Sequence, residues 1–391
     1  MKKTITKPVN NPDIGVVMPI YKQDLHYLQL ALTSILNQSY RNFMLVIVLD
    51  GAPAEVINRV NALTKQDPRV KVIDKRVNGG VSNALNTGFE YLYKIPSIKY
   101  LTWVSSDNIH YYRMIEKLRN GFTTNIDNRI GLVYSSFWHI DDKGVKTYTE
   151  TSREALLAYQ DQPKSQLFNY CFIGTCFLYK KDIAQRIRGY YLEPVEDYDY
   201  WLRFTENCEI KFIKEMLMEY RVNSPQSISS QLKSSTDQHR KWRNSFNIAR
   251  FQARKRQVIP TELTIVVPLH YRSPINLDSF ERIFEQYYSN FEVLLIDNSK
   301  NGEAKSLIQK IPDPRMKIIE TDNTTKLSSL VQYALPYITT PFATVFPESG
   351  VHYHDKYYIH NVMDQKKYHS QTFQKGAVYI SENLRKILGG Q

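Results

Sequence analysis

The chain of 391 residues contains few cysteines, and this limits the kinds of site that it can build. There are three, Cys171, Cys176 and Cys208, and no two of them have the CxxC spacing. A sparse, odd-numbered set of this kind argues against a disulfide framework and against a structural zinc site. We therefore expect buried, reduced thiols, as in a cytosolic protein.

Long apolar stretches are also missing from the sequence. No run of about 18 apolar residues occurs, so no membrane-spanning helix is predicted. The N-terminus is basic, but no apolar stretch follows it, which argues against a secretory signal peptide. These absences favour a cytoplasmic protein. Peripheral association with the inner face of a membrane stays open through a basic segment described below.

Acidic residues are outnumbered by basic ones, and the formal net charge is +12. Such an excess fits a polyanionic partner, which is a nucleic acid, an anionic membrane surface or a phosphate-bearing small molecule. Composition alone does not choose among the three. The length predicts two or three domains, and the hydrophobic content of 42% is that of a globular protein.

Strand and helix patterns alternate over the first hundred residues. The expected buried strands are 14–20, 43–49, 70–73 and 100–104, and the expected helices are 28–36 and 81–93. This alternation implies right-handed βαβ crossovers and a parallel sheet. Ligands of such sheets bind at the carboxyl ends of the strands. The polar residues expected there are Tyr21, Asp50, Asn78 and Asp107.

Residues 263–354 repeat the pattern of residues 14–112. QSYRNFMLVIVLD matches QYYSNFEVLLIDN, and DPRVKVID matches DPRMKIIE, in the same order along the chain. An ordered series of matches indicates an internal duplication. We expect a catalytic domain at 1–230, a basic linking helix at 231–258 and a degenerate, truncated second copy at 259–391.

The segment 239–256 carries many cations, with aromatic residues among them. We favour a solvated linking helix that packs on the first domain over a helix that lies on a membrane surface. The second copy lacks the acidic positions of the first, with Asn298 and Ser349 standing at the places of Asp50 and Asp107. We therefore expect it to be catalytically silent and to stabilise the first domain or mediate self-association as a homo-oligomer.

Two polar segments at the expected sheet edge suit a nucleotide. Asp50 ends a strand and precedes a glycine, so its carboxylate can accept hydrogen bonds from a base or a ribose, although strand-Asp-Gly is also an ordinary turn. In NGGVSNALNTG, at 78–88, glycines at the helix start free backbone amides to meet phosphate, and Asn86 would face back toward the site. The alternative is a tight turn between strand and helix.

Two further segments carry carboxylates. Asp107, in SSDN, can hold Mg²⁺ or Mn²⁺ and so bridge a diphosphate, or it can cap a helix. The segment 193–203 holds four carboxylates within seven residues, and their mutual repulsion costs stability unless a cation or a function offsets it. Asp199 and Arg203 have the spacing of a helical ion pair, which leaves Asp197 as the candidate base.

The ordered set of these motifs resembles the inverting family 2 glycosyltransferases of the GT-A fold. The segments that carry the resemblance are PIY (19–21), Asp-Gly (50–51), NGGVSNALNTG (78–88), SSDN (105–108), EDYDYWLR (196–203) and YRVNS (220–224). Together they cover roughly residues 12–230. The resemblance implies an α/β nucleotide-diphospho-sugar transferase fold, Rossmann-like with a mostly parallel sheet, followed by a partial, degenerate repeat of the same fold.

The resemblance also implies a role for each site residue. Pro19, Tyr21 and Asp50 would line the pocket for the nucleobase and ribose, and Asn78, Gly80 and Asn86 would lie near the ribose, diphosphate or sugar. Asp107, with Ser106 beside it, would bind the donor through Mn²⁺ or Mg²⁺. Asp197 would be the general base, with Glu196, Trp201 and Arg203 beside the acceptor. Trp201 would stack on a sugar ring or, as an alternative, fill the core.

The implied activity is transfer of a sugar, with inversion, from a nucleoside-diphosphate sugar such as a UDP-sugar. The acceptor would be the hydroxyl of a glycan, a lipid-linked glycan or another molecule. Ser105, Leu85 and Asn223 depart from the pattern of the family and weaken the metal and diphosphate site. They keep open a catalytically weak or inactive scaffold or sensor that binds sugar nucleotides. A nucleic-acid partner is not expected, because no recognition module accompanies the positive charge.

Overall fold

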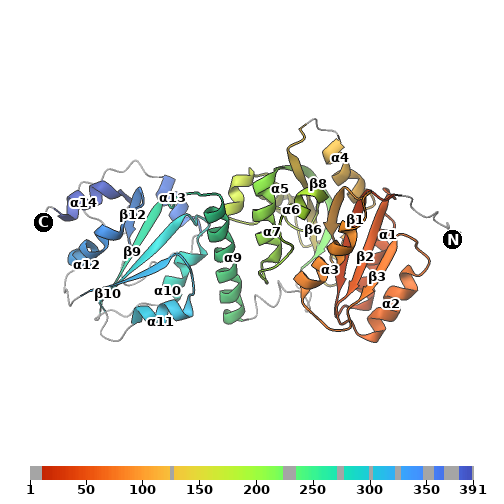
Figure 1. Cartoon of the computed structure of the whole chain (residues 1–391), viewed down its shortest axis with the longest axis horizontal. Helices are drawn as coiled ribbons and strands as arrows, with labels where there is room; N and C mark the ends of the chain where they lie inside the picture. Colours follow the sequence, from red (N-terminus) through yellow and green to blue (C-terminus); the bar gives the residue numbers. More distant parts are fainter. Residues whose placement is uncertain are drawn as a thin grey trace. The chain divides into compact units, whose positions relative to one another are not determined.

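The computed structural model describes residues 11–123, 127–222, 235–270, 277–298, 303–321, 327–346, 356–364 and 378–389. The chain divides into two compact units, coloured red to green and green to blue in Figure 1. The first unit is Met1–Leu167 with Cys171–His239, and the second is Phe168–Tyr170 with Arg240–Gln391. Within the described ranges, every helix is too short or too polar to cross a membrane.

The first unit is built on an eight-stranded sheet with the order β3-β2-β1-β4-β7-β6-β8-β5. Strands β3, β2, β1 and β4 are parallel, whereas β7 is antiparallel to both of its neighbours. The strands are β1 (Ile14–Ile20), β2 (Phe43–Leu49), β3 (Val70–Asp74), β4 (Tyr100–Trp103), β5 (Ile109–His110), β6 (Ile130–Ile140), β7 (Phe177–Lys180) and β8 (Glu209–Arg221). The helices are α1 (Leu25–Leu36), α2 (Ala54–Thr64), α3 (Val81–Tyr93), α4 (Met114–Thr123), α5 (Glu150–Gln160), α6 (Lys181–Arg186) and α7 (Glu196–Phe204).

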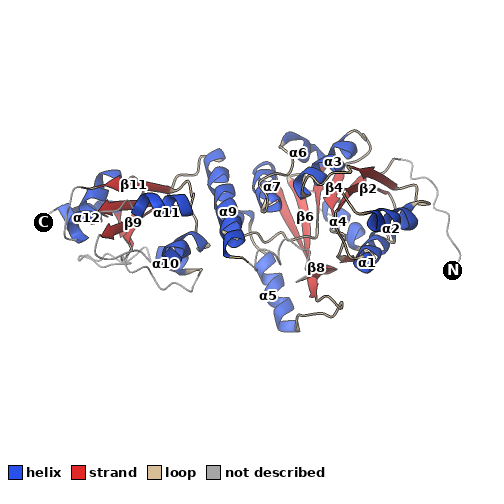
Figure 2. Ribbon diagram, turned by 90° about the horizontal axis from the view of Figure 1, so that it is seen from below, coloured by secondary structure: helices blue, strands red, loops and turns tan. Residues whose placement is uncertain are grey.

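Strand β1 lies in the middle of the parallel half and is buried on both faces, as a continuous apolar run predicts. Ile14, Val16 and Met18 point into the core that α1, α2 and α4 cover. Val17 points the other way, toward α3, where a Cβ on Gly88 would come within 2.5 Å of its side chain. Figure 2 shows α1 and α2 on one face of the sheet and α3 on the other.

The predicted α/β fold is confirmed, with a Rossmann-like parallel half and antiparallel strands beyond it. The apolar runs predicted as strands form β1, β2, β3 and β4, and the helix expected at 81–93 is α3. Because β1, β2 and β3 are parallel and in register, their carboxyl ends lie at one edge of the sheet. The polar residues that follow these strands are thereby brought together.

The second unit contains a five-stranded sheet with the order β11-β10-β9-β12-β13. This is the order of β3-β2-β1-β4-β7 in the first unit, and β13, like β7, is antiparallel to its neighbour. The strands are β9 (Leu263–His270), β10 (Phe291–Asn298), β11 (Met316–Glu320), β12 (Phe342–Val345) and β13 (Val378–Ile380). The helices are α9 (Thr236–Arg256), α10 (Leu277–Glu281), α11 (Glu303–Lys310), α12 (Leu327–Ala334), α13 (Tyr358–Asp364) and α14 (Ser381–Gly389).

The Asp-Pro-Arg turn before the third strand has the same contacts in both units. Arg69 donates from its backbone and side chain to Asp67, at 2.6 to 3.0 Å, and its guanidinium lies 4.6 Å from the ring of Phe43. Arg315 contacts Asp313 in the same way, at 2.7 to 3.0 Å, and stacks on the equivalent phenylalanine of β10 at 4.3 Å. This likeness supports the hypothesis of a duplication.

A glutamine supports the same hypothesis. In the first unit, the Oε1 of Gln38 accepts a hydrogen bond of 3.0 Å from the backbone of Ile115 in α4. In the second, the Oε1 of Gln286 accepts one of 3.1 Å from the backbone of Ile359 in α13. Gln38 and Gln286 are aligned in the sequence match given above. Both sheets are therefore tied to a later helix through an equivalent side chain.

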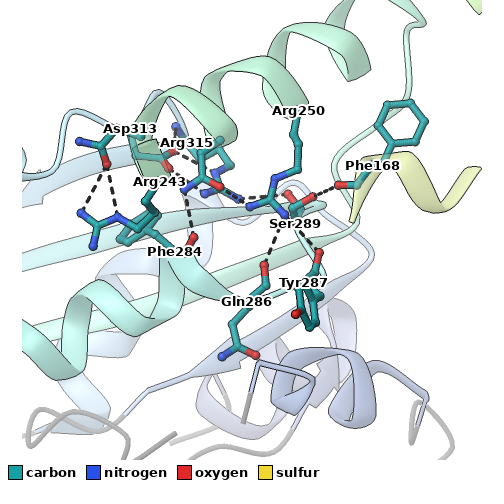
Figure 3. A network of polar contacts seen from close by, with 11 residues as sticks. Phe168, Arg243, Arg250, Phe284, Gln286, Tyr287, Ser289, Asp313 and Arg315 are labelled. Atoms are coloured by element: carbon teal, nitrogen blue, oxygen red, sulfur yellow. Dashed lines mark hydrogen bonds and ion pairs between the residues drawn. The ribbon is translucent and has the colours of Figure 1, made fainter. Parts of the chain in front are cut away.

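Helix α9 is bound mainly within the second unit, to which it belongs from Arg240 onward, whereas we had expected it to pack on the first domain. Arg240 and Arg243 pair with Glu281, at 2.7 and 3.4 Å. Buried Arg250 donates to the carbonyl oxygens of Gln286 and Tyr287 (Figure 3). It also donates to the carbonyl oxygen of Asn169. In the same network, Ser289 donates to the carbonyl oxygen of Phe168. The buried side chains of Arg243 and Arg250 are therefore not available to a membrane surface.

We predict that Arg315→Gln destabilises the second unit by roughly 3–5 kcal/mol, because it leaves the carboxylate of Asp313 buried without its partner. The side chain of Asp313 is 0% exposed. Lys317→Gln is the matched control: it removes an ion pair with Glu292 whose lysine is 62% exposed, and it should cost less than about 1 kcal/mol. Urea unfolding measures both. Equal losses would contradict the structural role of the turn.

Candidate functional site

Polar residues follow β1, β2 and β3 at the shared edge of the sheet. Tyr21 follows β1 and is 43% exposed, whereas Asp50, after β2, is only 3% exposed. Pro19 lies in β1 opposite Val48, and the backbone of Asp50 donates to the carbonyl oxygen of Ile20 at 2.8 Å. The sequence prediction that Tyr21 and Asp50 share one edge is confirmed by this register.

The carboxylate of Asp50 is surrounded by donors from the strand and loop that follow. Lys75 donates to it at 2.8 Å, and the backbone of Gly79 contacts both of its oxygens at 3.0 Å. The side chain of Asn78 donates to the carbonyl oxygen of Asp50 at 3.0 Å, and Lys75 also donates to the side chain of Asn83. Lys75 is a site residue that was not predicted from the sequence. It directly follows β3, as Asp50 directly follows β2, and this position is the signal that could have identified it.

The first turn of α3, where we expected a phosphate to bind, holds a carboxylate. Glu193 accepts a hydrogen bond of 2.9 Å from the backbone of Ser82. Its oxygens also lie over Gly80, which has a φ of +87°. Glu193 is exposed, so this turn faces solvent at the side where the carboxylate sits. An anion therefore suits the turn, and in this structure Glu193 supplies it.

Asn86 uses both ends of its amide within the protein. Its Nδ2 donates to the carbonyl oxygen of Tyr190 and its Oδ1 accepts from the backbone of the same residue, both at 2.8 Å. A Cβ on Gly189 would meet Asn86 at 2.2 Å, so the two segments touch closely. The side chain that the resemblance placed near the donor thus binds α3 to the segment that precedes Glu193.

Asp107 lies beyond β4 and is partly buried. Its Oδ1 accepts a hydrogen bond of 2.5 Å from Ser105, and its carbonyl oxygen accepts one of 3.3 Å from Arg221. Burial raises the pKa of Asp107, against the opposing effects of Ser105 and of the charge of Arg221. The structure assigns Ser106, its neighbour, no side-chain hydrogen bond among the described residues. Asn223 lies outside the described residues.

A metal ion at Asp107 is compatible with the donors present. Mg²⁺ and Mn²⁺ prefer oxygen ligands, and a site that shares the ion with a substrate diphosphate needs only one or two carboxylates. Asp107 and the hydroxyl of Ser105 supply such oxygens. Within the described ranges, no group of three or more His, Cys, Asp or Glu residues gathers as a complete metal cage. The residues thus fit an ion held jointly with the donor.

Glu196 and Asp197 begin α7 and are both poorly accessible to solvent. Burial, followed by repulsion from Asp197 and Glu193, raises the pKa of Glu196 to about 8. Burial also raises the pKa of Asp197, against a hydrogen bond of 2.7 Å from the backbone of Tyr198. The Oε2 of Glu196 is buried and accepts no hydrogen bond from the described residues. Carboxylates with raised pKa values are suited to proton transfer near neutral pH.

The other two residues expected beside the acceptor are buried. Arg203 pairs with Asp199 at 2.7 Å, which is the ion pair that the spacing predicted, and it also donates to the carbonyl oxygen of Gly189. Trp201 is 0% exposed and packs edge-on against Phe177. No face of the indole is open to a sugar ring. Of the two interpretations given for Trp201, the core tryptophan is the one that the packing supports.

Comparison with known proteins gives a family match in both units. The family model described as glycosyl transferase family 2 matches residues 15–188 and 264–346. An uncharacterized glycosyltransferase of Rickettsia felis is 24% identical over 77% of this chain, and the chain spans only about half of that protein, 55% of its length. The O-antigen biosynthesis glycosyltransferase WbnJ of Escherichia coli is 29% identical over 56% of this chain and 83% of WbnJ.

Among solved structures, TarS of S. aureus in complex with UDP is similar, with a TM-score of 0.44 and 13% identity. The match covers 60% of this chain and 64% of TarS.

We predict that the stability of the protein depends on pH through Glu196. A glutamate in the unfolded chain has a pKa of about 4.5, so the native state holds an extra proton on Glu196 between about pH 4.5 and 8. The free energy of unfolding therefore falls as pH rises through that window. Glu196→Gln should remove this loss and be more stable than the wild type at pH 8 by at least about 1 kcal/mol, but not at pH 4.5.

Chemical denaturation at several pH values measures this difference. Glu90→Gln, at an exposed position of α3, is the matched control and should follow the wild-type profile. If the profile of Glu196→Gln also runs parallel to that of the wild type, Glu196 does not carry the extra proton.

Proposed function

Since the chain belongs to glycosyl transferase family 2, we propose that it transfers a sugar from a UDP-sugar to an acceptor hydroxyl with inversion. The observation that carries the proposal is the pair of partly buried carboxylates, Glu196 and Asp197, at the start of α7, whose pKa values are both raised. Glu193, three residues before Glu196, contacts the first turn of α3 and so connects this pair to the edge that holds Asp50. In this proposal, the residues that bind the donor and those that bind the acceptor both belong to the first unit.

Tyr21, Asp50 and Asn78 would bind the nucleobase and ribose, with Pro19 in the adjoining part of β1. Asp50 is already held by Lys75 and by the backbone of Gly79, and these contacts fix the orientation of its carboxylate. Lys75 adds a cation to the donor side of the site, where Leu85 replaces the arginine common in the family. This charge favours an anionic nucleotide.

Asp197 is the proposed general base. Its carboxylate takes the proton of the acceptor hydroxyl while the oxygen attacks the anomeric carbon from the face opposite the leaving group. The bond between the anomeric carbon and the diphosphate oxygen breaks, and the nucleoside diphosphate departs with that electron pair. One displacement of this kind inverts the configuration. The raised pKa of Asp197 makes it a stronger base than an exposed aspartate.

Asp107 and Ser105 are the residues that would hold Mg²⁺ or Mn²⁺ together with the diphosphate. A bound divalent ion supplies positive charge that neutralises the leaving group. Arg221 fixes the backbone of Asp107 through its carbonyl oxygen, and the side chain of Asn108 accepts a hydrogen bond of 3.0 Å from the backbone of Arg221. These contacts orient the loop that carries the carboxylate.

A glycan or lipid-linked glycan is the acceptor that we favour. The O-antigen biosynthesis glycosyltransferase WbnJ is a relative with a role of this kind in its name. A second candidate is a weakly active or inactive scaffold that binds sugar nucleotides. The ion pair of Asp50 with Lys75 and the carboxylate at the first turn of α3 favour it, because both groups already have protein partners. Turnover of a UDP-sugar decides between the two.

We predict that Asp107→Ala abolishes the part of UDP binding that depends on Mn²⁺ and leaves the fold intact. The reason is that Asp107 is the only carboxylate in SSDN. Calorimetric titration with UDP, with and without Mn²⁺, measures the change. Asp182→Ala, an aspartate whose side chain is 71% exposed, is the control and should bind as the wild type does. Unchanged affinity in Asp107→Ala would refute the metal assignment.

Asp197→Asn should keep its affinity for UDP but lose about 10²–10⁴-fold in turnover, because an amide cannot accept the proton of the acceptor. Turnover is followed as UDP release from a panel of UDP-sugars, with and without added glycan acceptors. Asp182→Asn serves as the control. If Asp197→Asn turns over at the wild-type rate, Glu196 becomes the better candidate for the base.

A further inference from the structure

Glu193 caps helix α3 through a hydrogen bond to Ser82, which lies 111 residues before it in the sequence. Its Oε1 accepts the backbone N–H of Ser82 at 2.9 Å, in the first turn of α3. The N-cap position of that helix is Gly80, which has no side chain to accept the bond. An acceptor at a helix start satisfies a backbone donor, and a negative charge there also interacts favourably with the helix dipole. Glu193 provides both.

The carboxylate lies directly against the backbone of Gly80. A Cβ on this residue would approach the Oε1 and Oε2 of Glu193 to 2.9 and 3.2 Å. The φ of +87° at Gly80 is a conformation that side-chain-bearing residues rarely adopt. Gly80, the second glycine of the NGG motif, thus allows the turn and also leaves room for the carboxylate of Glu193.

The segment that carries Glu193 is held from two sides. On the α3 side, Asn86 forms two hydrogen bonds with the backbone of Tyr190. On the α7 side, Arg203 donates to the carbonyl oxygens of Arg188 and Gly189. Glu193 therefore reaches α3 from a segment whose path both helices fix, rather than from a free loop.

The charge of Glu193 also acts on one carboxylate of α7, that of Glu196. The pKa of Glu196 is raised first by burial, then by Asp197 and then by Glu193. Asp197, for its part, acts electrostatically on the thiol of Cys171 and on Tyr190. Of the three carboxylates Glu193, Glu196 and Asp197, Glu193 is the one with a hydrogen bond to α3 among the described residues, and so it links the two sides of the site.

We propose that Glu193 is a positioning residue, which ties the first turn of α3 to the start of α7 through its hydrogen bond to Ser82 and through its charge. The inference rests on the proposed function only where α3 is assigned to the donor and α7 to the acceptor. A donor that binds at the first turn of α3 would then change the electrostatic environment of Glu196 in α7, because Glu193 interacts with both helices.

Two substitutions separate the hydrogen bond from the charge. Glu193→Gln keeps an oxygen that can accept from Ser82 but removes the charge, and Glu193→Ala removes both. Glu90→Gln is the matched control, because it removes one carboxylate from an exposed position of α3. Two quantities are measured on the full chain: amide hydrogen exchange at Ser82 and the titration of the Glu196 carboxyl by NMR.

We expect Glu193→Ala to speed exchange at Ser82 by roughly 3–10-fold, and Glu193→Gln to change it by less than about 2-fold, since a lost cap costs on the order of 1 kcal/mol. Both variants should move the titration of Glu196 to lower pH, while Glu90→Gln should leave it unchanged. Unchanged exchange in Glu193→Ala, or an unchanged titration of Glu196 in both variants, overturns the proposal.

The proposed function is tested by a separate measurement, the release of UDP by the wild type. If the wild type releases no UDP from any UDP-sugar, that function fails, whereas exchange at Ser82 and the NMR titration still decide whether Glu193 links the two helices.

Discussion

A buried ion pair within α7 holds the candidate site together. Asp199 and Arg203 are one helical turn apart and form an ion pair. The guanidinium of Arg203 also donates hydrogen bonds to the carbonyl oxygens of Arg188 and Gly189. Charges of this kind are stable in a core only when their hydrogen bonds are satisfied by fixed partners. The pair therefore fixes the path of the segment before α7. The positions of Tyr190 and Glu193 against α3, and of the carboxylates that begin α7, depend on it.

The fold could be predicted from the sequence because its signals are local. The run from Ile14 to Ile20 is apolar throughout, which is what a strand buried on both faces requires, and the helix at 81–93 was predicted with its observed bounds. The order of the second sheet follows the sequence match between the two halves. The placement of α9 was wrong. Its cations were taken as solvated, but Arg243 and Arg250 are buried with partners far along the chain, which local patterns do not reveal.

The candidate site could be predicted only in part, and the reason is again distance along the chain. Asp50 and Tyr21 follow from strand register, and the pair of Asp199 with Arg203 follows from helical spacing. The contact of Glu193 with the first turn of α3 spans 111 residues and has no signature in either segment. The burial of Trp201 was not predictable either. It depends on how α7 packs on β7, and the residue type alone does not determine that packing.

The path of the chain has a consequence for synthesis on the ribosome. The chain passes between the two units at 167–168, 170–171 and 239–240, because the three residues Phe168–Tyr170 belong to the second unit. Their partners, Arg250, Tyr287 and Ser289, are translated much later. At about 5–20 residues per second, several seconds pass before these partners are synthesised. During that time they are not available to the segment Phe168–Tyr170. Completion of the second unit thus requires three residues that are translated within the span of the first.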